Sequence, residues 1–316
     1  MNWKKIAFRT LLVGSVTLLF LVLFAYPYFA MQRPVGSKNL VVEGWMHHEG
    51  LMEARALFLT GGYDHIYVTG TMRPFAYYLE EGKEIRILLN EPIEHTILVG
   101  AAGLPTTKWY VISGTDTLLT QRSTKNTTDH EIDATGKRLR ELRFVTTSAQ
   151  TAAPGVPIVF IAMLDVDGTP AHSIAQIQLV DKNGITTSGW PTHADAGRAA
   201  LIEAGISADK ITAVPTMQHT GGRTFGSGRT FIEYAKKNGI DAFDIATLGV
   251  HARRTWKGYV TAKETAEGVG IIPLYDPWCK RWTWWTNPYG WFQIGKEVAA
   301  LPHVLIQGQG GAADQE

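Results

Sequence analysis

The chain has 316 residues, of which 45% are hydrophobic and 19% charged, and this is enough for one large domain or two modest ones. A net charge of +1 gives no general electrostatic reason to bind nucleic acid, so we expect no nucleic-acid partner. The single cysteine, Cys279, excludes a disulfide within the chain and leaves the cellular compartment open.

A long apolar run follows the N-terminus. Lys4, Lys5 and Arg9 precede residues 11–31, which carry no charged side chain and are long enough to cross a bilayer. A cleavable signal peptide is the alternative, but its apolar core is usually shorter, and Tyr28 stands where the only plausible cleavage site needs a small residue. We therefore expect residues 11–31 to be an uncleaved transmembrane signal anchor.

The basic residues before this run predict its orientation. Positive charge favours the cytoplasmic side, so residues 1–10 are expected to form a cytoplasmic tail. The chain after Arg33 is then exported. This topology predicts a single-pass protein of the plasma membrane, the inner membrane of a bacterium, with most of the chain extracytoplasmic.

Strands and helices alternate in two parts of the exported chain. Such alternation predicts an α/β fold with a parallel sheet between helices. The expected elements are, in chain order, strand 39–43, helix 49–60, strand 65–69, helix 194–204, strand 211–214, a helix ending at 237, strand 244–250, a helix from 251, strand 269–274 and a helix at 289–300.

The chain between these two parts has a different pattern. From about residue 76 to about residue 187, short β-type segments alternate with turn residues, which predicts a β-sandwich. This β-domain is inserted after the second strand of the α/β domain. We place the α/β domain at 39–73 and 190–304, and the insert at 74–189.

The most informative motif is residues 243–255, an apolar strand that runs directly into His251, Arg253 and Arg254. Ligands of open α/β sheets bind where strand carboxyl ends meet helix N-termini, and the free N–H groups there favour an anion. His251 and Arg254 have the spacing of neighbours on one helix face, whereas Arg253 points about a third of a turn away. The alternative is that His251 caps the helix and the arginines pair with surface carboxylates.

We favour the functional interpretation, because the helix dipole disfavours cations in a first turn unless an anion is bound. Arg253 and Arg254 are then expected to hold a phosphate or a carboxylate, and the sequence does not distinguish between the two.

A glycine-rich stretch, residues 218–227, follows the preceding strand and is expected at the same sheet edge. Its glycines allow the backbone to approach a ligand closely, and Arg223, Thr224 and Ser227 are expected to contact that ligand. Ordinary turn formation is the alternative. The stretch matches neither a P-loop nor the dinucleotide fingerprint, so we expect no NAD and no other cofactor.

The ends of the first two strands complete the predicted site. Glu43 ends the first strand and is the best placed carboxylate for general acid or base chemistry, alongside His251. Gly44 and Gly70 are expected to contact the ligand. The adjacent histidines at 47 and 48 lack a spaced partner ligand, so we expect no metal there.

Six of the ten tryptophans fall between residues 256 and 291, with Lys280 and Arg281 among them. Such a segment is suited to a membrane surface or to a platform for sugar or lipid. The alternative is ordinary packing of the last helix on the sheet, and we expect Trp284 and Trp285 to be structural.

The α/β part resembles the family of bacterial envelope proteins that includes SanA, ElyC and YdcF. The resemblance covers about two-thirds of the chain and implies a Rossmann-like three-layer fold with a role in cell-envelope or peptidoglycan-precursor metabolism. It rests on residues 41–45 (Val-Val-Glu-Gly-Trp), 67–70 (Tyr-Val-Thr-Gly), Arg223-Thr224, 247–254 (Thr-Leu-Gly-Val-His-Ala-Arg-Arg) and Trp284-Trp285 followed by Gly290 and Glu297.

The insert resembles a calcium-dependent, xylan-binding carbohydrate-binding module in its strand pattern and in residues 97–103 and 158–168. This implies a carbohydrate partner, with Tyr77, Tyr78 and Trp109 as candidate stacking residues, although strand aromatics more often belong to the core. The family's acidic stretches are replaced here by residues 146–148 and 154–157. The acidic residues at 165 and 167 alternate on a strand end, so we expect no calcium site.

Two functions of different classes follow. In the first, a membrane-tethered hydrolase or transferase acts on a phosphorylated lipid or sugar of the envelope, with Arg223, Arg253 and Arg254 holding the phosphate and His251 or Glu43 moving the proton. In the second, a non-catalytic envelope factor senses or presents the anionic ligand, and the insert binds carbohydrate or a protein partner.

Overall fold

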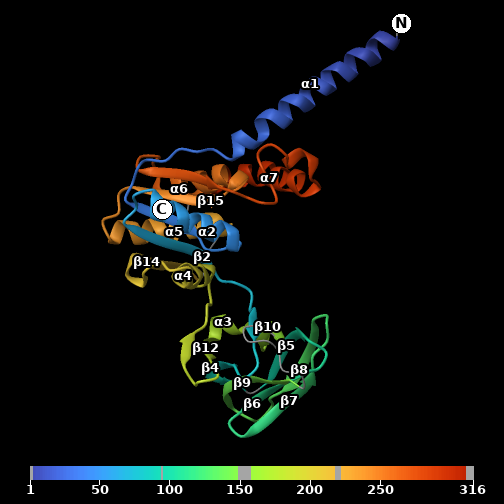
Figure 1. The fold of residues 1–316 in the computed structure, drawn as a ribbon, viewed down its shortest axis with the longest axis vertical. Coiled ribbons are helices and arrows are strands. Elements are labelled where there is room, and N and C mark those ends of the chain that lie inside the picture. The colour runs from blue at the N-terminus through green and yellow to red at the C-terminus, as the bar shows by residue number, and fades with distance from the viewer. Residues whose placement is uncertain (1–2, 94, 149–157, 218–221, 311–316) are drawn as a thin grey trace. The chain divides into compact units, whose positions relative to one another are not determined.

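A computed structural model describes residues 3–93, 95–148, 158–217 and 222–310. The protein is a mixed α/β protein with one five-stranded parallel sheet, separate antiparallel sheets and an apolar N-terminal helix (Figure 1). The chain divides into two compact units. Met1–Thr71 together with Thr192–Glu316 form the α/β unit, and Met72–Pro191 form the β unit.

The α/β unit is built on the parallel sheet, whose strands pair in the order β14-β2-β1-β15-β16. Its strands are near-continuous apolar runs, as expected for a sheet covered on both faces, and every residue of β15 is buried. The strands are β1 (Asn39–Glu43), β2 (His65–Thr71), β14 (Ile211–Thr216), β15 (Phe243–Leu248) and β16 (Val269–Leu274).

The strand order reverses beside the first strand. From β1 the chain proceeds outward to β2 and β14, then returns to the other side of β1 for β15 and β16. Connections on the two sides of this point diverge, so a crevice is expected at the carboxyl ends of β1 and β15.

Helices cover both faces of this sheet, because successive strand residues point to opposite sides. Leu40 packs with Leu201 and the other apolar residues of α2 and α4, whereas Val41 packs with Phe231 and Tyr259 of α5 and α6. The helices are α2 (His48–Thr60), α4 (His193–Glu203), α5 (Arg223–Lys237), α6 (Ala252–Lys263) and α7 (Pro288–Gly310), with short 3-10 turns η1 (Ala208–Lys210), η2 (Gly249–His251) and η3 (Trp284–Thr286).

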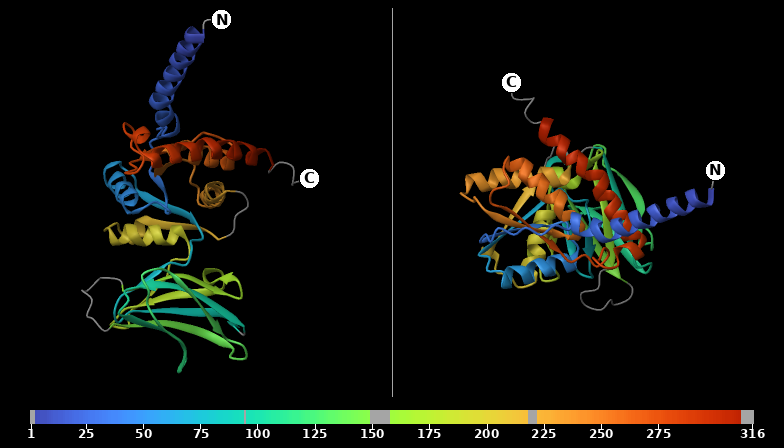
Figure 2. Two further views of the ribbon diagram at one scale, coloured as in Figure 1. Left: turned by 90° about the vertical axis from the view of Figure 1, so that its right-hand side faces the viewer. Right: turned by 90° about the horizontal axis from the view of Figure 1, so that it is seen from above.

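The N-terminal helix α1 (Trp3–Phe29) contains the one apolar stretch among the described residues that is long enough to cross a membrane, Phe8–Phe29, with a mean hydropathy of 2.1. Its last turns pack beside α7 and η3 (Figure 2), where Phe29 is buried with Trp284 and Ile294. The following linker is held to the sheet edge by two backbone hydrogen bonds between Arg33 and Ile271.

The β unit consists of antiparallel strands in two sheets that share one apolar core. The first sheet has the order β11-β10-β5-β8, with β3 also paired to β10, and the second has the order β13-β12-β4-β9-β6-β7. The elements are β3 (Tyr77–Leu79), β4 (Glu84–Ile93), β5 (Thr96–Gly103), β6 (Thr107–Ser113), β7 (Asp116–Arg122), β8 (Thr128–Asp133), β9 (Leu139–Ser148), β10 (Val159–Val166), β11 (Thr169–Pro170), α3 (Ala171–Ile174), β12 (Ala175–Val180) and β13 (Thr186–Ser188).

The candidate sugar-stacking aromatics of the β unit differ in exposure. Trp109 and Tyr77 are buried in the core and cannot meet a sugar, whereas Tyr78 is 64% exposed. Asp167, one of the two acidic residues considered above for calcium, lies in the turn between β10 and β11. Its carboxylate accepts the N–H of Thr96 at 2.9 Å, so it has a structural partner within the β unit. Residues 154–157, cited above for the absence of a calcium site, lie outside the described residues.

One boundary beside the predicted site differs from expectation. The strand expected at 244–250 ends at Leu248, and His251 belongs to η2 rather than to the helix, which begins at Ala252. Gly249 adopts φ +26°, a backbone conformation that ends an extended strand and that glycine tolerates. The turn brings His251 back over the carboxyl end of the sheet.

Candidate functional site

A cavity of about 270 Å³ lies at the carboxyl edge of the parallel sheet, beside the point where the strand order reverses. It is lined from β1, β2 and the first turns of α4, α5 and α6, with α7 on one side. Six of its residues were predicted from the sequence, namely Glu43, Arg223, Thr224, Ser227, His251 and Arg254, and four were not, namely Trp45, Thr71, His193 and Lys296.

His251 stands between two buried carboxylates. Its Nδ1 lies 3.0 Å from Oε1 of Glu297 on α7, and its Nε2 lies 3.8 Å from Oε2 of Glu43 at the end of β1. Trp45 covers the imidazole edge-on, with ring centroids 5.0 Å apart. The ring is therefore held in one orientation by groups from two separate parts of the chain, the end of β1 and α7.

Arg254 ties this arrangement together. Its Nε donates to Oε2 of Glu297 at 2.7 Å and its Nη2 to Oε1 at 3.1 Å, a two-point contact that suits a planar guanidinium. The same Nη2 lies 2.8 Å from Nδ1 of His251. One arginine thus contacts both members of the histidine–carboxylate pair.

These contacts link the two nitrogens of His251. A guanidinium only donates, so Nδ1 accepts from Arg254 when it carries no proton and donates to Glu297 when it does. In the first case the neutral ring carries its proton on Nε2, which faces Glu43 and lies 3.4 Å from Oγ1 of Thr224. The tautomer of His251 therefore depends on whether Nδ1 is paired with Arg254 or with Glu297.

The charge of Glu297 is maintained by the same partners. Burial alone would raise the pKa of this carboxyl, but hydrogen bonds from His251 and Arg254 outweigh burial and hold the pKa at about 2. Glu297 is therefore a carboxylate at neutral pH.

Glu43 is 1% exposed and is also hydrogen-bonded. Its Oε2 accepts the hydroxyl of Thr247 and, at 3.2 Å, the hydroxyl of Thr255. Two donors on one oxygen fix the orientation of this side chain at the end of β1.

The remaining cations lie at the rim of the cavity. Arg223 and Lys296 are exposed, and neither forms an ion pair with any residue that the structure describes. Arg223 opens α5, whose N-cap position is Gly222 and supplies no side-chain hydrogen bond to the first turn. Thr224 and Ser227 extend the polar wall along the same helix. Helix N–H groups and unpaired cations at one opening give that opening a positive potential.

Gly44 and Gly70 do not line the cavity. A Cβ on Gly44 would stand 2.1 Å from the carbonyl oxygen of His193, and one on Gly70 would stand 2.6 Å from Cβ of the same histidine. Both glycines allow the first turn of α4 to lie directly on the strand ends. They position the wall that carries His193.

Arg253 lies outside the cavity and is removed from the candidate site. Its guanidinium stacks on the ring of Tyr28 at 3.9 Å and its Nε donates to the carbonyl oxygen of Tyr28 at 2.5 Å. The physical reason is the helical period. With Arg254 directed at Glu297, the preceding side chain is turned toward α1.

Several site residues were missed by the sequence patterns. Glu297 was noted only as a part of the family resemblance, and Lys296, beside it, was not noted at all. Trp45, Thr71 and His193 each follow or precede a predicted element by one or two positions, so the rule that sites form at strand carboxyl ends could have identified them.

Three further predictions concern the glycine-rich stretch, a metal site and the cysteine. The segment Gln218–Gly221 of the glycine-rich stretch lies outside the described residues. Within the described ranges, no group of three or more His, Cys, Asp or Glu side chains is arranged to hold a metal ion. Cys279 is buried, and burial followed by the charge of Asp276 raises its pKa to about 12, which does not suit a nucleophile.

No protein-family model matches the chain, and no curated protein or solved structure matches it significantly.

Proposed function

We propose that this chain is a membrane-anchored, exported member of the SanA/ElyC/YdcF-like envelope proteins that binds an anionic ligand, a phosphorylated lipid or sugar, at the carboxyl edge of a Rossmann-like sheet. In this proposal α1 is the single transmembrane anchor and the β unit is an inserted β-sandwich. The strand order, with its reversal beside β1, and the helices on both sheet faces support the Rossmann-like interpretation.

The observation that carries the proposal is the distribution of charge around the cavity. Arg254 is neutralised by Glu297, but Arg223 and Lys296 converge on the same opening without a carboxylate partner among the described residues. Two unpaired cations beside a helix N-terminus are costly to bring together unless an anion joins them. A ligand with one phosphate has the charge and the size that this opening accepts.

The reaction class that the geometry supports is hydrolysis or transfer of a phosphoryl or glycosyl group. His251 presents Nε2 to the cavity while Glu297 holds Nδ1, the arrangement that lets an imidazole take up and return a proton. Arg223 and Lys296 would offset the charge that develops on the ligand. The hydroxyl of Thr224 lies 3.4 Å from Nε2 of His251 but also accepts a hydrogen bond from Nη1 of Arg254, so we propose a water molecule as the attacking group.

The anchor and its orientation follow from the N-terminal segment. The stretch Phe8–Phe29 is long and apolar enough to cross a bilayer, and Lys4 and Lys5 precede it. Under the positive-inside rule both units lie outside the cytoplasm, at the outer surface of the plasma membrane of a bacterial cell.

The test is a thermal-shift titration of the full chain in detergent with short prenyl phosphates, nucleotide sugars, citrate and neutral oligosaccharides. A ligand at about a hundred times its dissociation constant stabilises the native state by about 2.7 kcal/mol. We expect phosphorylated ligands to raise the melting temperature, Arg223→Ala to abolish the rise, and Arg253→Ala to retain it. A shift by citrate alone would replace phosphate with carboxylate, and an unchanged response of Arg223→Ala would contradict the proposal.

A second function is favoured by one observation in the β unit. Tyr78 is 64% exposed and stacks on Phe160 with ring centroids 4.6 Å apart, beside a hollow of about 430 Å³ that Lys125 also lines. An exposed tyrosine ring that stacks on a half-buried phenylalanine beside a hollow is suited to a sugar ring, so we propose carbohydrate binding by the β unit as the alternative activity.

Calorimetric titration with xylo-oligosaccharides tests this alternative. We expect binding by the full chain that is lost in Tyr78→Ala and kept in Tyr110→Ala, since Tyr110 lies on the other sheet of the β unit. Equal binding by both variants would exclude the Tyr78 surface.

A further inference from the structure

An unusual share of exposed apolar side chains gathers near the C-terminus of the α/β unit. Outside α1, the described part of this unit exposes 12 large hydrophobic side chains, and eight of them fall within residues 275–298. Exposed apolar groups at this density mark an interaction surface rather than ordinary surface composition. We name six of these residues the aromatic collar: Trp278, Trp282, Trp285, Tyr289, Trp291 and Phe292.

The same segment is fastened to the membrane helix by its buried residues. Trp284 is fully buried, packs in a cluster with Phe29 and Ile294, and donates its Nε1 hydrogen to the carbonyl oxygen of Val22 at 3.3 Å. Val22 lies seven residues before the end of the candidate span. The collar is therefore set against the last two turns of α1, not beyond its end.

The length of the span determines the depth of these turns. At about 1.5 Å per residue, the 22 residues of Phe8–Phe29 measure about 33 Å, close to the hydrocarbon thickness of a bilayer of about 30 Å. Without the turns from Val22 to Phe29 the apolar stretch that remains, Phe8–Leu21, measures only about 21 Å, which is too short to span. These turns must lie at bilayer depth, and the protein packed on them must lie at the same depth.

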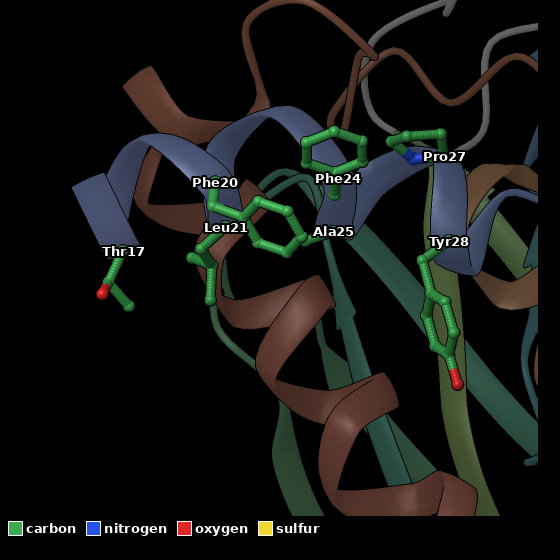
Figure 3. Close-up of a pocket in the computed structure, with 7 residues that line it drawn as sticks. All are labelled: Thr17, Phe20, Leu21, Phe24, Ala25, Pro27 and Tyr28. Carbon is green, nitrogen blue, oxygen red and sulfur yellow. The ribbon is translucent and has the colours of Figure 1, made fainter.

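The face of α1 around these turns is suited to hydrocarbon. An apolar hollow of about 570 Å³ is lined from Thr17 to Tyr28, with Phe20, Leu21 and Phe24 among its walls (Figure 3). Water has few polar partners there, whereas a lipid chain fills such a hollow without cost.

The charges of the collar segment fit an interface rather than the bilayer interior. Lys280 and Arg281 are exposed, and the guanidinium of Arg281 lies 4.9 Å from the centroid of the Trp282 ring. The two acidic residues of the segment, Asp276 and Glu297, are both buried, and Asp276 accepts the backbone N–H groups of Trp278 and Cys279. Tryptophan and tyrosine with exposed cations are typical of the headgroup layer of anionic membranes.

We infer that the aromatic collar is a second membrane contact, seated in the lipid headgroup layer of the leaflet that α1 leaves. This inference rests on the membrane anchoring proposed above. It also deepens the function of the site, because Phe292 of the collar lies one helical turn from Lys296 at the rim of the cavity. A cavity in this position would bind the anionic headgroup of a membrane lipid.

The test is site-specific labelling of the full chain in vesicles of phosphatidylcholine and phosphatidylglycerol. A polarity-sensitive fluorophore is attached at Trp282→Cys, with Phe292→Cys as a second position and Lys236→Cys at the end of α5 as the matched control. The parent chain, whose one cysteine is buried, provides the blank. Both collar probes should emit at shorter wavelengths than the Lys236→Cys probe. Spin-labelled lipid should quench them about threefold more strongly than that control.

Flotation of the same vesicles tests the membrane anchor separately from the aromatic collar. If the chain floats and both collar probes respond like the Lys236→Cys probe, the collar is aqueous and the inference is overturned while the anchor stands. If the chain does not float, the anchor and the collar are overturned together. Neither result depends on ligand binding at the cavity, which is tested independently by Arg223→Ala.

Discussion

Oε1 of Glu297 lies 3.0 Å from Nδ1 of His251, although 46 residues separate them in the chain. The carboxylate is 1% exposed, and its other oxygen takes the Nε hydrogen of Arg254. This contact fixes the last helix against the turn that follows β15. Glu297 is thus the positioning residue for the imidazole, and its charge is the most strongly held charge of the site.

The acid stability of the protein should reflect this carboxylate. The pKa of Glu297 is about 2 in the folded protein, below the ordinary value of 4.5, because hydrogen bonds from His251 and Arg254 outweigh the effect of burial. A depressed pKa contributes stability that is complete above about pH 4.5 and is lost as the pH falls toward 2. We expect the free energy of unfolding to fall by up to about 3 kcal/mol in this window, measured by denaturant unfolding of the full chain in detergent.

The matched control is Glu297→Gln, which removes the titrating group and keeps the shape. At pH 7 this variant should lose about 3–5 kcal/mol, because Arg254, whose side chain is only 18% exposed, remains without its charge partner. The difference between the two proteins should shrink below pH 4.5. A difference that stays constant down to pH 2 would show that Glu297 is not the group concerned.

The two glycines beneath His193 should tolerate no side chain. In Gly44→Ala the new Cβ would stand 2.1 Å from the carbonyl oxygen of His193, so the first turn of α4 must move away from the sheet. Overpacking of this kind costs about 1–3 kcal/mol. The comparison is Gly295→Ala, where a Cβ meets nothing within 4 Å and helix propensity favours alanine, so its melting temperature should be unchanged or higher.

Cys279 should be almost inert to alkylation in the folded protein. Burial, and after it the charge of Asp276, raises the thiol pKa to about 12, so at pH 8 the thiolate is about a thousandfold scarcer than at an ordinary cysteine. Mass spectrometry after iodoacetamide treatment should find Cys279 unmodified while the introduced Lys236→Cys is labelled fully. Labelling at equal rates would contradict the burial of this loop.

The sequence predicted well those features that depend on local pattern. Strands β1 and β16 have the predicted bounds, because each is an apolar run closed by a turn residue or a polar neighbour. The helical period also separated Arg254, which contacts His251, from Arg253, which contacts Tyr28. What the period did not indicate is which of the two faces the cavity.

Features that depend on packing between distant segments were not predictable. No local signal marks Glu297 as the partner of His251, since their contact depends on how α7 folds back over the sheet. In the β unit, the bounds of β7 and β8 could not be predicted, because their mostly polar residues show little of the apolar alternation that marks a strand.

Replacement of His251 should separate a catalyst from a binding protein. In His251→Gln the amide can still hydrogen-bond to Thr224 and Glu297 but cannot take up a proton, whereas Arg223 and Lys296 are untouched. If the chain hydrolyses a phosphorylated lipid or sugar, turnover should fall by about 10²–10⁴ while the dissociation constant changes little. Arg223→Ala should show the reverse, weaker binding with a smaller loss of turnover at saturating ligand.

Release of phosphate and thermal shift, measured on the same preparations, give the two readouts. Should the parent chain bind phosphorylated ligands without turnover, and His251→Gln bind them equally well, the site belongs to a non-catalytic envelope factor and the proton-transfer role of His251 is excluded.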